Sequence, residues 1–330
     1  EGPIQRGLPE GDWQFYSAEG KLSAQTRMQA GQMNGPQILF NADGRHRAFH
    51  TLVDGRRQGP STLFHPDGSV SDNLGYQGDQ LEGPAQGWWP DGGPRYTANW
   101  KAGKLEGPSL EYFPSGAKRS EAFYVAGKKD GPARTWNEKG ELTSEEPWKE
   151  DQLDGLVREF YPDGKSKVET TYRAGKKNGP FRSFGSDGSL ATSGEFQNDK
   201  LSGPLLLHYP DGKPFAECQY DSDRLLGGRL LYPDGKLLGQ FGPVVGDSGK
   251  VSSLLLQYPD GKPMSSARFD AASNTVSWQG WNPDGSPLGQ IENLPATRNP
   301  PPGANSPNPN PNPNPVFSAW LSQQESLEVQ

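Results

Sequence analysis

The chain has 330 residues, of which 31% are hydrophobic, and a formal net charge of -7. With a sequence pI of about 5.3 it lacks the basic character of proteins that bind nucleic acid or anionic membranes, so we expect neither partner. Its mean hydropathy of -0.85 is typical of disordered chains, and a folded chain of this composition needs another source of order.

Aromatic residues placed at regular intervals can supply that order, and the interval is set by glycine, which recurs at two fixed phases up to about residue 212. Gly107 and Gly131 begin successive copies of one pattern, and Gly116 and Gly140 lie within those copies, so the period is 24 residues. Each period contains two runs of strand composition separated by turn residues. A fixed period of this length predicts a stacked array whose repeat unit is a β-hairpin.

Large side chains, mostly aromatic, recur every 12 residues, one in each expected strand. They are Tyr16, Met28, Phe40, Leu52, Phe64, Tyr76, Trp88, Trp100, Tyr112, Tyr124, Trp136, Trp148, Phe160, Tyr172, Phe184, Phe196, His208 and Tyr220. Small residues such as Ala98 and Ala122 lie two positions away, and polar residues such as Glu121 and Glu169 alternate with them. This alternation predicts a sheet with the ladder on its buried face and a polar face in water. The predicted fold class is all-β: an elongated, twisted and open single-layer antiparallel β-meander.

The expected organisation has three parts. A hairpin array occupies residues 1–289, regular to about residue 212 and irregular over 213–289, where the glycine spacing changes as expected for capping repeats. A Pro/Asn-rich linker follows at residues 290–315, which should be extended and semi-rigid.

A short amphipathic segment, residues 316–330, forms the third part. Phe317, Trp320 and Leu321 fall on one face of a helix, with polar residues behind them. Such a segment on a tether either docks back on its own sheet or engages a partner.

Two stretches, Tyr124–Pro132 (YVAGKKDGP) and Tyr172–Pro180 (YRAGKKNGP), combine an aromatic residue, Gly-Lys and Gly-Pro. Together with the recurring Tyr-Pro-Asp-Gly they make about residues 7–289 resemble the MORN repeat, in the variant of bacterial antitoxin-like and immunity proteins. The chain is also similar to periplasmic immunity proteins that neutralise type VI secreted phospholipase D effectors. The resemblance implies an elongated β-meander that acts by binding a protein, here an effector of lipase type.

The sequence contains no arrangement of residues typical of an enzyme. His46 and His50 fall on one expected strand without a further ligand nearby, and no Gly-rich loop lies between a strand and a helix. Cys218 is the only cysteine, which excludes a disulfide within the chain and favours a packed thiol. We therefore expect no enzymatic activity, no cofactor and no bound metal.

Two features single out candidate partner-binding residues: a concentration of tryptophan, and a run between Glu138 and Asp163 in which nine acids face three bases. The candidates are Trp88, Trp89, Trp100, Trp136, Glu145, Glu146, Trp148, Glu150 and Asp151. Adjacent Trp88 and Trp89 should point to opposite faces, which exposes one ring as an interface anchor unless a neighbour covers it. An acidic patch would speed encounter with a basic partner. The alternative is that the ladder tryptophans are core and the acids form a solvated face.

The favoured function is that of an immunity or antitoxin protein that neutralises a secreted lipase-type effector by occluding it. The alternative is a MORN-type scaffold for membrane or protein assembly, although the chain lacks the basic clusters that would face a bilayer. No apolar run is long enough for direct membrane insertion. The chain begins at Glu1 without methionine, so we expect either a removed export signal and a periplasmic location, or a cut in a longer and cytoplasmic chain.

Overall fold

The computed structural model describes residues 1–242, 253–270 and 275–295, and every regular element in them is a β-strand. The strands are β1 (Ile4–Gln5), β2 (Leu8–Pro9), β3 (Gly11–Tyr16), β4 (Leu22–Gln29), β5 (Gln32–Phe40), β6 (His46–Val53), β7 (Arg56–Arg57), β8 (Gly59–Phe64), β9 (Val70–Gln77), β10 (Gln80–Leu81), β11 (Gly83–Trp88), β12 (Pro94–Lys101), β13 (Lys104–Leu105), β14 (Gly107–Tyr112), β15 (Lys118–Val125), β16 (Lys128–Lys129), β17 (Gly131–Trp136), β18 (Leu142–Lys149), β19 (Gln152–Leu153), β20 (Gly155–Phe160), β21 (Ser166–Arg173), β22 (Lys176–Phe184), β23 (Leu190–Gln197), β24 (Lys200–Leu201), β25 (Gly203–His208), β26 (Pro214–Asp221), β27 (Arg224–Leu231), β28 (Leu237–Gly242), β29 (Ser253–Gln257), β30 (Pro263–Asp270), β31 (Thr275–Trp281) and β32 (Pro287–Pro295).

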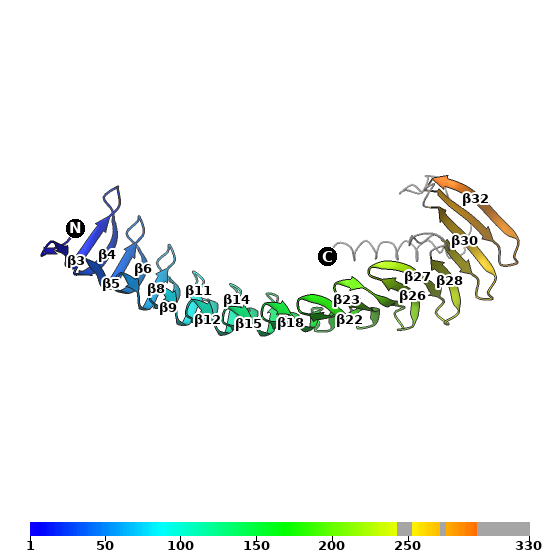
Figure 1. Cartoon of the computed structure of the whole chain (residues 1–330), viewed down its shortest axis with the longest axis horizontal. Coiled ribbons are helices and arrows are strands. Elements are labelled where there is room, and N and C mark those ends of the chain that lie inside the picture. Colours follow the sequence, from blue (N-terminus) through cyan, green and yellow to red (C-terminus); the bar gives the residue numbers. More distant parts are fainter. Residues whose placement is uncertain (243–252, 271–274, 296–330) are drawn as a thin grey trace.

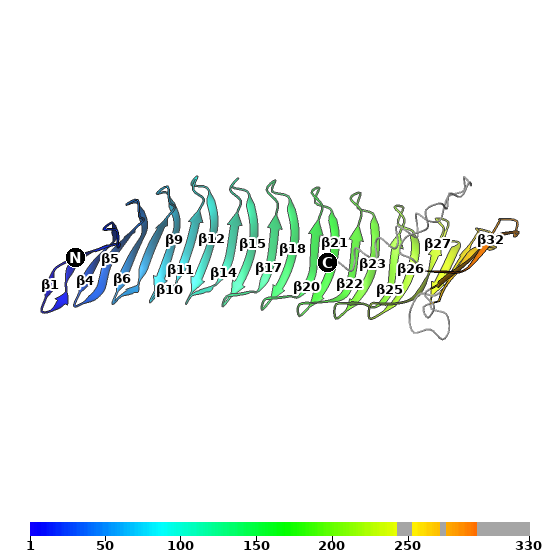
Figure 2. The ribbon, with the colours of Figure 1, turned by 90° about the horizontal axis from the view of Figure 1, so that it is seen from above.

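Consecutive full-length strands pair antiparallel from β3 to β32 and form one long curved sheet (Figure 1). Seen from above, the strands cross its long axis and the turns line its two long edges (Figure 2). Within the described residues β3 pairs with β4 alone and β32 with β31 alone, and these strands lie at opposite ends of the molecule. The sheet is therefore open, and the predicted β-meander is confirmed.

The repeat of residues 107–130 shows how each unit is built. β14 pairs with β15 from Gly107 opposite Tyr124 to Tyr112 opposite Lys118, with a β-bulge at Arg119 of β15, opposite the step from Glu111 to Tyr112. After a tight turn the chain forms the two-residue strand β16 along the end of β15, and the next hairpin begins with β17.

The wide turn of each hairpin ends in glycine, and in many repeats it has the sequence Pro-Asp-Gly. In Tyr161–Gly164 the amide of Gly164 donates to the carbonyl of Tyr161 at 2.9 Å, and Asp163 accepts from the amide of Lys165 at 3.1 Å. Gly164 has φ +83°, the left-handed conformation that closes a three-residue hairpin loop. The Tyr161 hydroxyl donates to the carbonyl of Phe184 at 2.8 Å, which ties this turn to the next repeat.

The tight turn at the opposite edge is of type I′, since both its residues have positive φ. Glu150 has φ 49° and Asp151 has φ 66°. The amide of Asp151 donates to the carbonyl of Lys129 at 2.9 Å, and its carboxylate accepts from the amide of Lys129 at 2.7 Å. Each edge of the sheet is thus a ladder of turns bonded from one repeat to the next.

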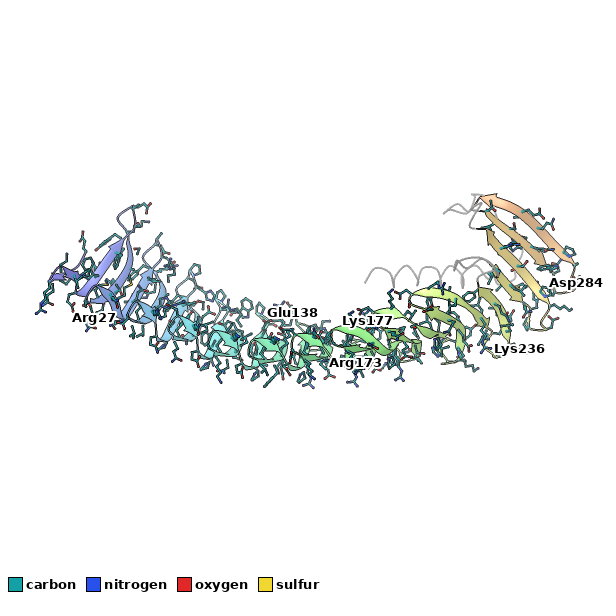
Figure 3. All side chains as sticks on the ribbon, in the orientation of Figure 1. Arg27, Glu138, Arg173, Lys177, Lys236 and Asp284 are labelled. Carbon is teal, nitrogen blue, oxygen red and sulfur yellow. The ribbon has the colours of Figure 1, made fainter. Side chains whose placement is uncertain are left out.

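The curvature gives the sheet two unlike faces. Figure 3 shows Lys177 on the inner side of the bow and Arg27 and Arg173 on the outer side. We call these sides the concave and the convex face. Lys177 Nζ lies 5.2 Å from the ring centroid of Phe196, which places the second-strand members of the ladder on the concave face.

The first-strand members of the ladder lie on the convex face, which corrects the prediction of a single aromatic face. The Tyr16 hydroxyl donates to Gln14 at 2.6 Å, and the ring of Phe64 lies 4.9 Å from that of Phe49. Equal spacing along the sequence passes through a turn and a bulge, and neither preserves the alternation of side chains between faces.

The best-packed part of the concave face comprises Phe181, Leu205, Leu207, Ala216, Cys218 and Tyr220. Cys218 is buried, as predicted. The hairpins continue beyond residue 212 to β32, which ends at Pro295 and so includes the start of the stretch expected as a linker. Residues 243–252, the rest of that linker and the amphipathic segment 316–330 lie outside the described residues.

Candidate protein-binding surface

Trp88 and Trp89 lie where β11 enters its wide turn, and both are half-buried. The guanidinium of Arg95 lies 6.0 Å from the Trp89 ring centroid. Trp89 Nε1 is buried and has no hydrogen-bond acceptor among the described residues. Trp89 occupies the same position in its wide turn as Tyr161, whose hydroxyl donates to the next repeat. A neighbour therefore covers Trp89, and neither ring of the pair is a fully exposed anchor.

Trp100 and Trp148 belong to a column of side chains along the concave face. In this column residues of the two-residue strands lie against the rings of the following repeat: Arg57 Cζ is 4.1 Å from the Tyr76 ring centroid, and Lys129 Nζ is 4.7 Å from that of Trp148. Cation–π contacts of this kind add to the burial of the ring. The two tryptophans are half-buried parts of the array that keep one side accessible.

Trp136 lies on the convex face, at the end of β17. Lys118 Nζ is 5.0 Å from its ring centroid and 2.9 Å from the carboxylate of Glu121. The four ladder tryptophans of the candidate set are thus divided between the two faces.

Glu145 takes part in a row of charges that crosses the convex face. Its carboxylate lies 2.9 Å from Arg134 and 3.7 Å from Arg158, and Arg158 lies 3.7 Å from Glu169. Opposite charges face one another directly across the strands, an arrangement that stabilises a sheet. The acid predicted to attract a partner is therefore already paired within the sheet.

Glu150 and Asp151 form the tight turn after β18. Asp151 accepts from the amide of Lys129, and Glu150 lies 3.9 Å from Lys128. These two acids occupy the edge of the sheet, so the nine candidates do not form one patch.

Three carboxylates share the concave face of the central repeats: Glu111 on β14, Glu146 on β18 and Glu159 on β20. Glu111 accepts from the Ser120 hydroxyl at 3.2 Å, and Glu146 accepts from Trp148 Nε1 at 3.0 Å. None of the three forms an ion pair with the described residues, in contrast to the acids of the convex face.

The pKa values of two neighbouring tyrosines are raised by burial and by nearby carboxylates, including these three. Burial, together with the charges of Glu111 and Asp151, raises the pKa of Tyr124. The pKa of Tyr172 is raised by burial and by the charges of Asp199, Glu159 and Glu146. Carboxylates and aromatic rings therefore share this face in neighbouring rows, and we call the concave side of β14–β21 the acidic concave surface.

Glu111 lies outside the acidic run and was missed for that reason, whereas Glu159 lies within the run but was not among the candidates. Counting strand positions would have found them, since each lies two residues after an inward-facing position of its strand, Ser109 and Val157. The same count separates Glu145 from Glu146.

In the part of the chain that the structure describes, no three His, Cys, Asp or Glu side chains converge on a metal-sized site. His50 Nδ1 lies 2.9 Å from Ser61 Oγ, and its pKa is lowered by burial and by the nearby charges of Arg57 and Arg47. Among these same residues no helix has the length and apolar character needed to span a membrane.

Comparison with protein families finds a MORN repeat variant at residues 153–174, which covers the hairpin of β20 and β21. The sequence therefore contains a MORN repeat variant within its array of hairpins. No curated protein matches the chain.

Among solved structures, the crystal structure of TcdB2-TccC3-Cdc42 shares 10% identity, with 82% of this chain and 17% of that chain covered and a TM-score of 0.16. TcdB2-TccC3 without its hypervariable C-terminal region shares 11%, with 82% and 18% covered and a TM-score of 0.18. The Photorhabdus luminescens Tc holotoxin pore with the TccC3 D651A mutation shares 11%, with 85% and 18% covered and a TM-score of 0.17. The chain spans less than a fifth of these chains, and TM-scores of this size support no conclusion about fold or function.

Proposed function

We propose that this array of β-hairpins, which contains a MORN repeat variant, is a non-enzymatic protein-binding protein. Its contact surface is the acidic concave surface of β14–β21, and its partner presents basic side chains to that surface.

The observation that carries this proposal is the separation of charge between the two faces. On the convex face Glu145 and Glu169 are paired with arginines, whereas Glu111, Glu146 and Glu159 on the concave face form no ion pair with the described residues. Lysine and arginine side chains can pair with such carboxylates and lie over the rings of Tyr124, Trp148 and Tyr172.

The area of this surface suits a stable complex. Six full-length strands spaced by ~4.8 Å, each with about six residues at ~3.3 Å, cover on the order of 600 Å². A standard complex buries roughly 800 Å² on each partner, so the surface and its rim approach the size needed.

The more specific function that we propose is that of an immunity or antitoxin protein, which neutralises a secreted lipase-type effector by covering it. Occlusion needs no catalytic group on the inhibitor, and the sequence resemblance to the antitoxin-like MORN variant supports this choice.

A capture experiment tests the binding surface. The chain serves as bait for secreted and envelope fractions of the source organism, beside a variant with Glu111→Gln, Glu146→Gln and Glu159→Gln. A control variant with Asp12→Asn, Glu19→Gln and Glu195→Gln removes the same charge outside that surface. We expect a protein captured by the native chain and the control to be lost with the first variant. Equal capture by all three would show that the acidic concave surface is not the contact.

The captured protein then tests the immunity role. We expect the native chain to abolish its lipase activity at stoichiometric amounts, and the triple Gln variant to need a higher concentration. If the captured partner keeps its activity in the presence of the native chain, the immunity role is overturned, while the proposed binding surface is still supported by the capture experiment.

A further inference from the structure

The concave face changes character toward the C-terminal end of the array. Two rows of directly paired residues cross it from β25 to β32, one beginning at Leu205 and the other at Leu207, and neither contains a charged residue. Phe241, Leu254, Trp278 and Ile291 belong to the first row. We call this part the apolar concave face.

The convex side of the same strands is more polar, although it also presents Leu255, which is 38% exposed. It carries the ion pair of Arg229 with Glu217, and Gln240, Gln279 and Gln290 follow in the same row. Since charge is confined to one side over eight strands, the apolar side is the one suited to contact with another apolar surface.

Trp278, which is half-buried, lies over the last two strands of this face. A Cβ at Gly280 would lie 2.5 Å from the Trp278 ring and one at Gly289 would lie 3.7 Å from it, so the ring lies flat on the backbone of β31 and β32. Its other side points away from the sheet. At the end of the row, Ile291 keeps 43% of its surface exposed.

The sequence that follows this face contains an apolar segment. The last described strand, β32, ends at Pro295, and the spacing of Phe317, Trp320 and Leu321 in residues 316–330 predicts that they share one helical face. That segment contains Glu325 and Glu328 and no lysine or arginine. Like charge therefore keeps it from the acidic concave surface, and the uncharged part of the face remains for it.

The connecting residues have sufficient reach. Residues 296–315 span ~60 Å if fully extended at 3.1 Å per residue, and about 25 Å on average if flexible. The apolar concave face extends over seven strand spacings, about 34 Å from β32 to β25. Every position on it therefore lies within reach.

We propose that Val316–Gln330 docks on the apolar concave face of β25–β32, with Phe317, Trp320 and Leu321 against the sheet. This inference is independent of the proposed function, because the acidic concave surface lies on other repeats and stays open to a partner.

Two adjacent serines of β30 provide a matched test. Ser265 lies opposite Leu256 and Gly280 on the concave face, and Ser266 lies opposite Leu255 and Gln279 on the convex face. Ser265→Cys and Ser266→Cys are made separately in the full chain, and the rate of reaction with a thiol reagent is measured. The native Cys218 is only 2% exposed and gives a low background in both.

An effective concentration in the millimolar range would keep a segment with an intrinsic Kd of ~0.1 mM docked about ten times more often than free. We therefore expect removal of residues 316–330 to speed labelling of Ser265→Cys about tenfold and to leave Ser266→Cys unchanged. Trp320→Ala in the full chain should produce a smaller increase at the concave site alone.

Equal labelling of Ser265→Cys with and without the segment would overturn the proposal. Protection that increases with protein concentration and survives removal of the segment would assign the face to a second copy of the chain, which also overturns it.

Discussion

A shift of one residue decides which environment a side chain enters in this sheet. Glu145 and Glu146 are adjacent, yet Glu145 pairs with two arginines on the convex face while Glu146 accepts from Trp148 on the concave face. Leu205 and Leu206 show the same division, since Leu205 is 1% exposed in the packed cluster and Leu206 lies opposite Glu217 on the other side.

We expect Leu205→Ala to lower the free energy of unfolding by about 3 kcal/mol, the usual cost of a cavity in a packed core. Leu206→Ala serves as the control and should cost roughly 1 kcal/mol or less, because its side chain remains partly solvated. Urea denaturation of the two variants measures both values. Similar losses at the two positions would show that the faces are assigned incorrectly.

The elements of this protein are held together by their turns as much as by their strands. The wide turns stack through contacts such as Lys165 Nζ donating to the carbonyl of Ser186 at 3.1 Å. Each depends on a left-handed glycine, and Gly164 has no atom within 4 Å of where a Cβ would lie. Glycine is therefore required at this position by its backbone conformation, and not because a larger side chain would clash with its neighbours.

Gly164→Ala should lower the free energy of unfolding by about 1 kcal/mol, since left-handed alanine costs ~1–2 kcal/mol and the gain from a stiffer unfolded chain offsets part of it. Gly164→Asn should cost less, because asparagine tolerates this conformation. Thermal unfolding of both variants provides the measurement, and a loss for Asn as large as for Ala would contradict the conformational explanation.

The aspartates of the wide turns should make the stability of the protein depend on pH. Hydrogen bonds from backbone amides lower the pKa of Asp163, Asp211, Asp234 and Asp260 below the ordinary value of 3.8. A lowered folded-state pKa contributes stability above the unfolded-state value, and that contribution disappears as the pH falls through the lowered pKa.

We therefore expect the urea midpoint to fall as the pH decreases from about 5 through 3.8 and below. A variant with asparagine at these four positions keeps the side-chain acceptor but cannot titrate, so its midpoint should change less over the same range. An identical pH dependence in the two proteins would exclude the turn aspartates as its source.

At the scale of the whole molecule, the array grows in one dimension. The described chain contains 24 strands longer than two residues. At ~4.8 Å per strand spacing they extend over roughly 110 Å along the sheet. Each repeat contacts its neighbours, so the length of the molecule follows from the number of hairpins.

Small-angle scattering should give a radius of gyration of about 30 Å or more, as for a rod of this length, compared with ~20 Å for a compact chain of 330 residues. The value should change little with salt, since the turns are joined by backbone hydrogen bonds. A radius near that of the compact chain would contradict the open array.

The sequence by itself determined the repeat, the strand and turn positions and the open meander, because glycine, Pro-Asp-Gly and the alternation of side chains act locally within 24 residues. Only the tertiary structure decided which of these residues share a surface. The bulge near the start of each second strand, as at Arg119 opposite the step from Glu111 to Tyr112, breaks the alternation that equal spacing suggests, and so the ladder is divided between two faces. Pairing between neighbouring strands then neutralises Glu145 and leaves Glu111, Glu146 and Glu159 on the concave side, an outcome that depends on cross-strand register and not on acid density along the chain.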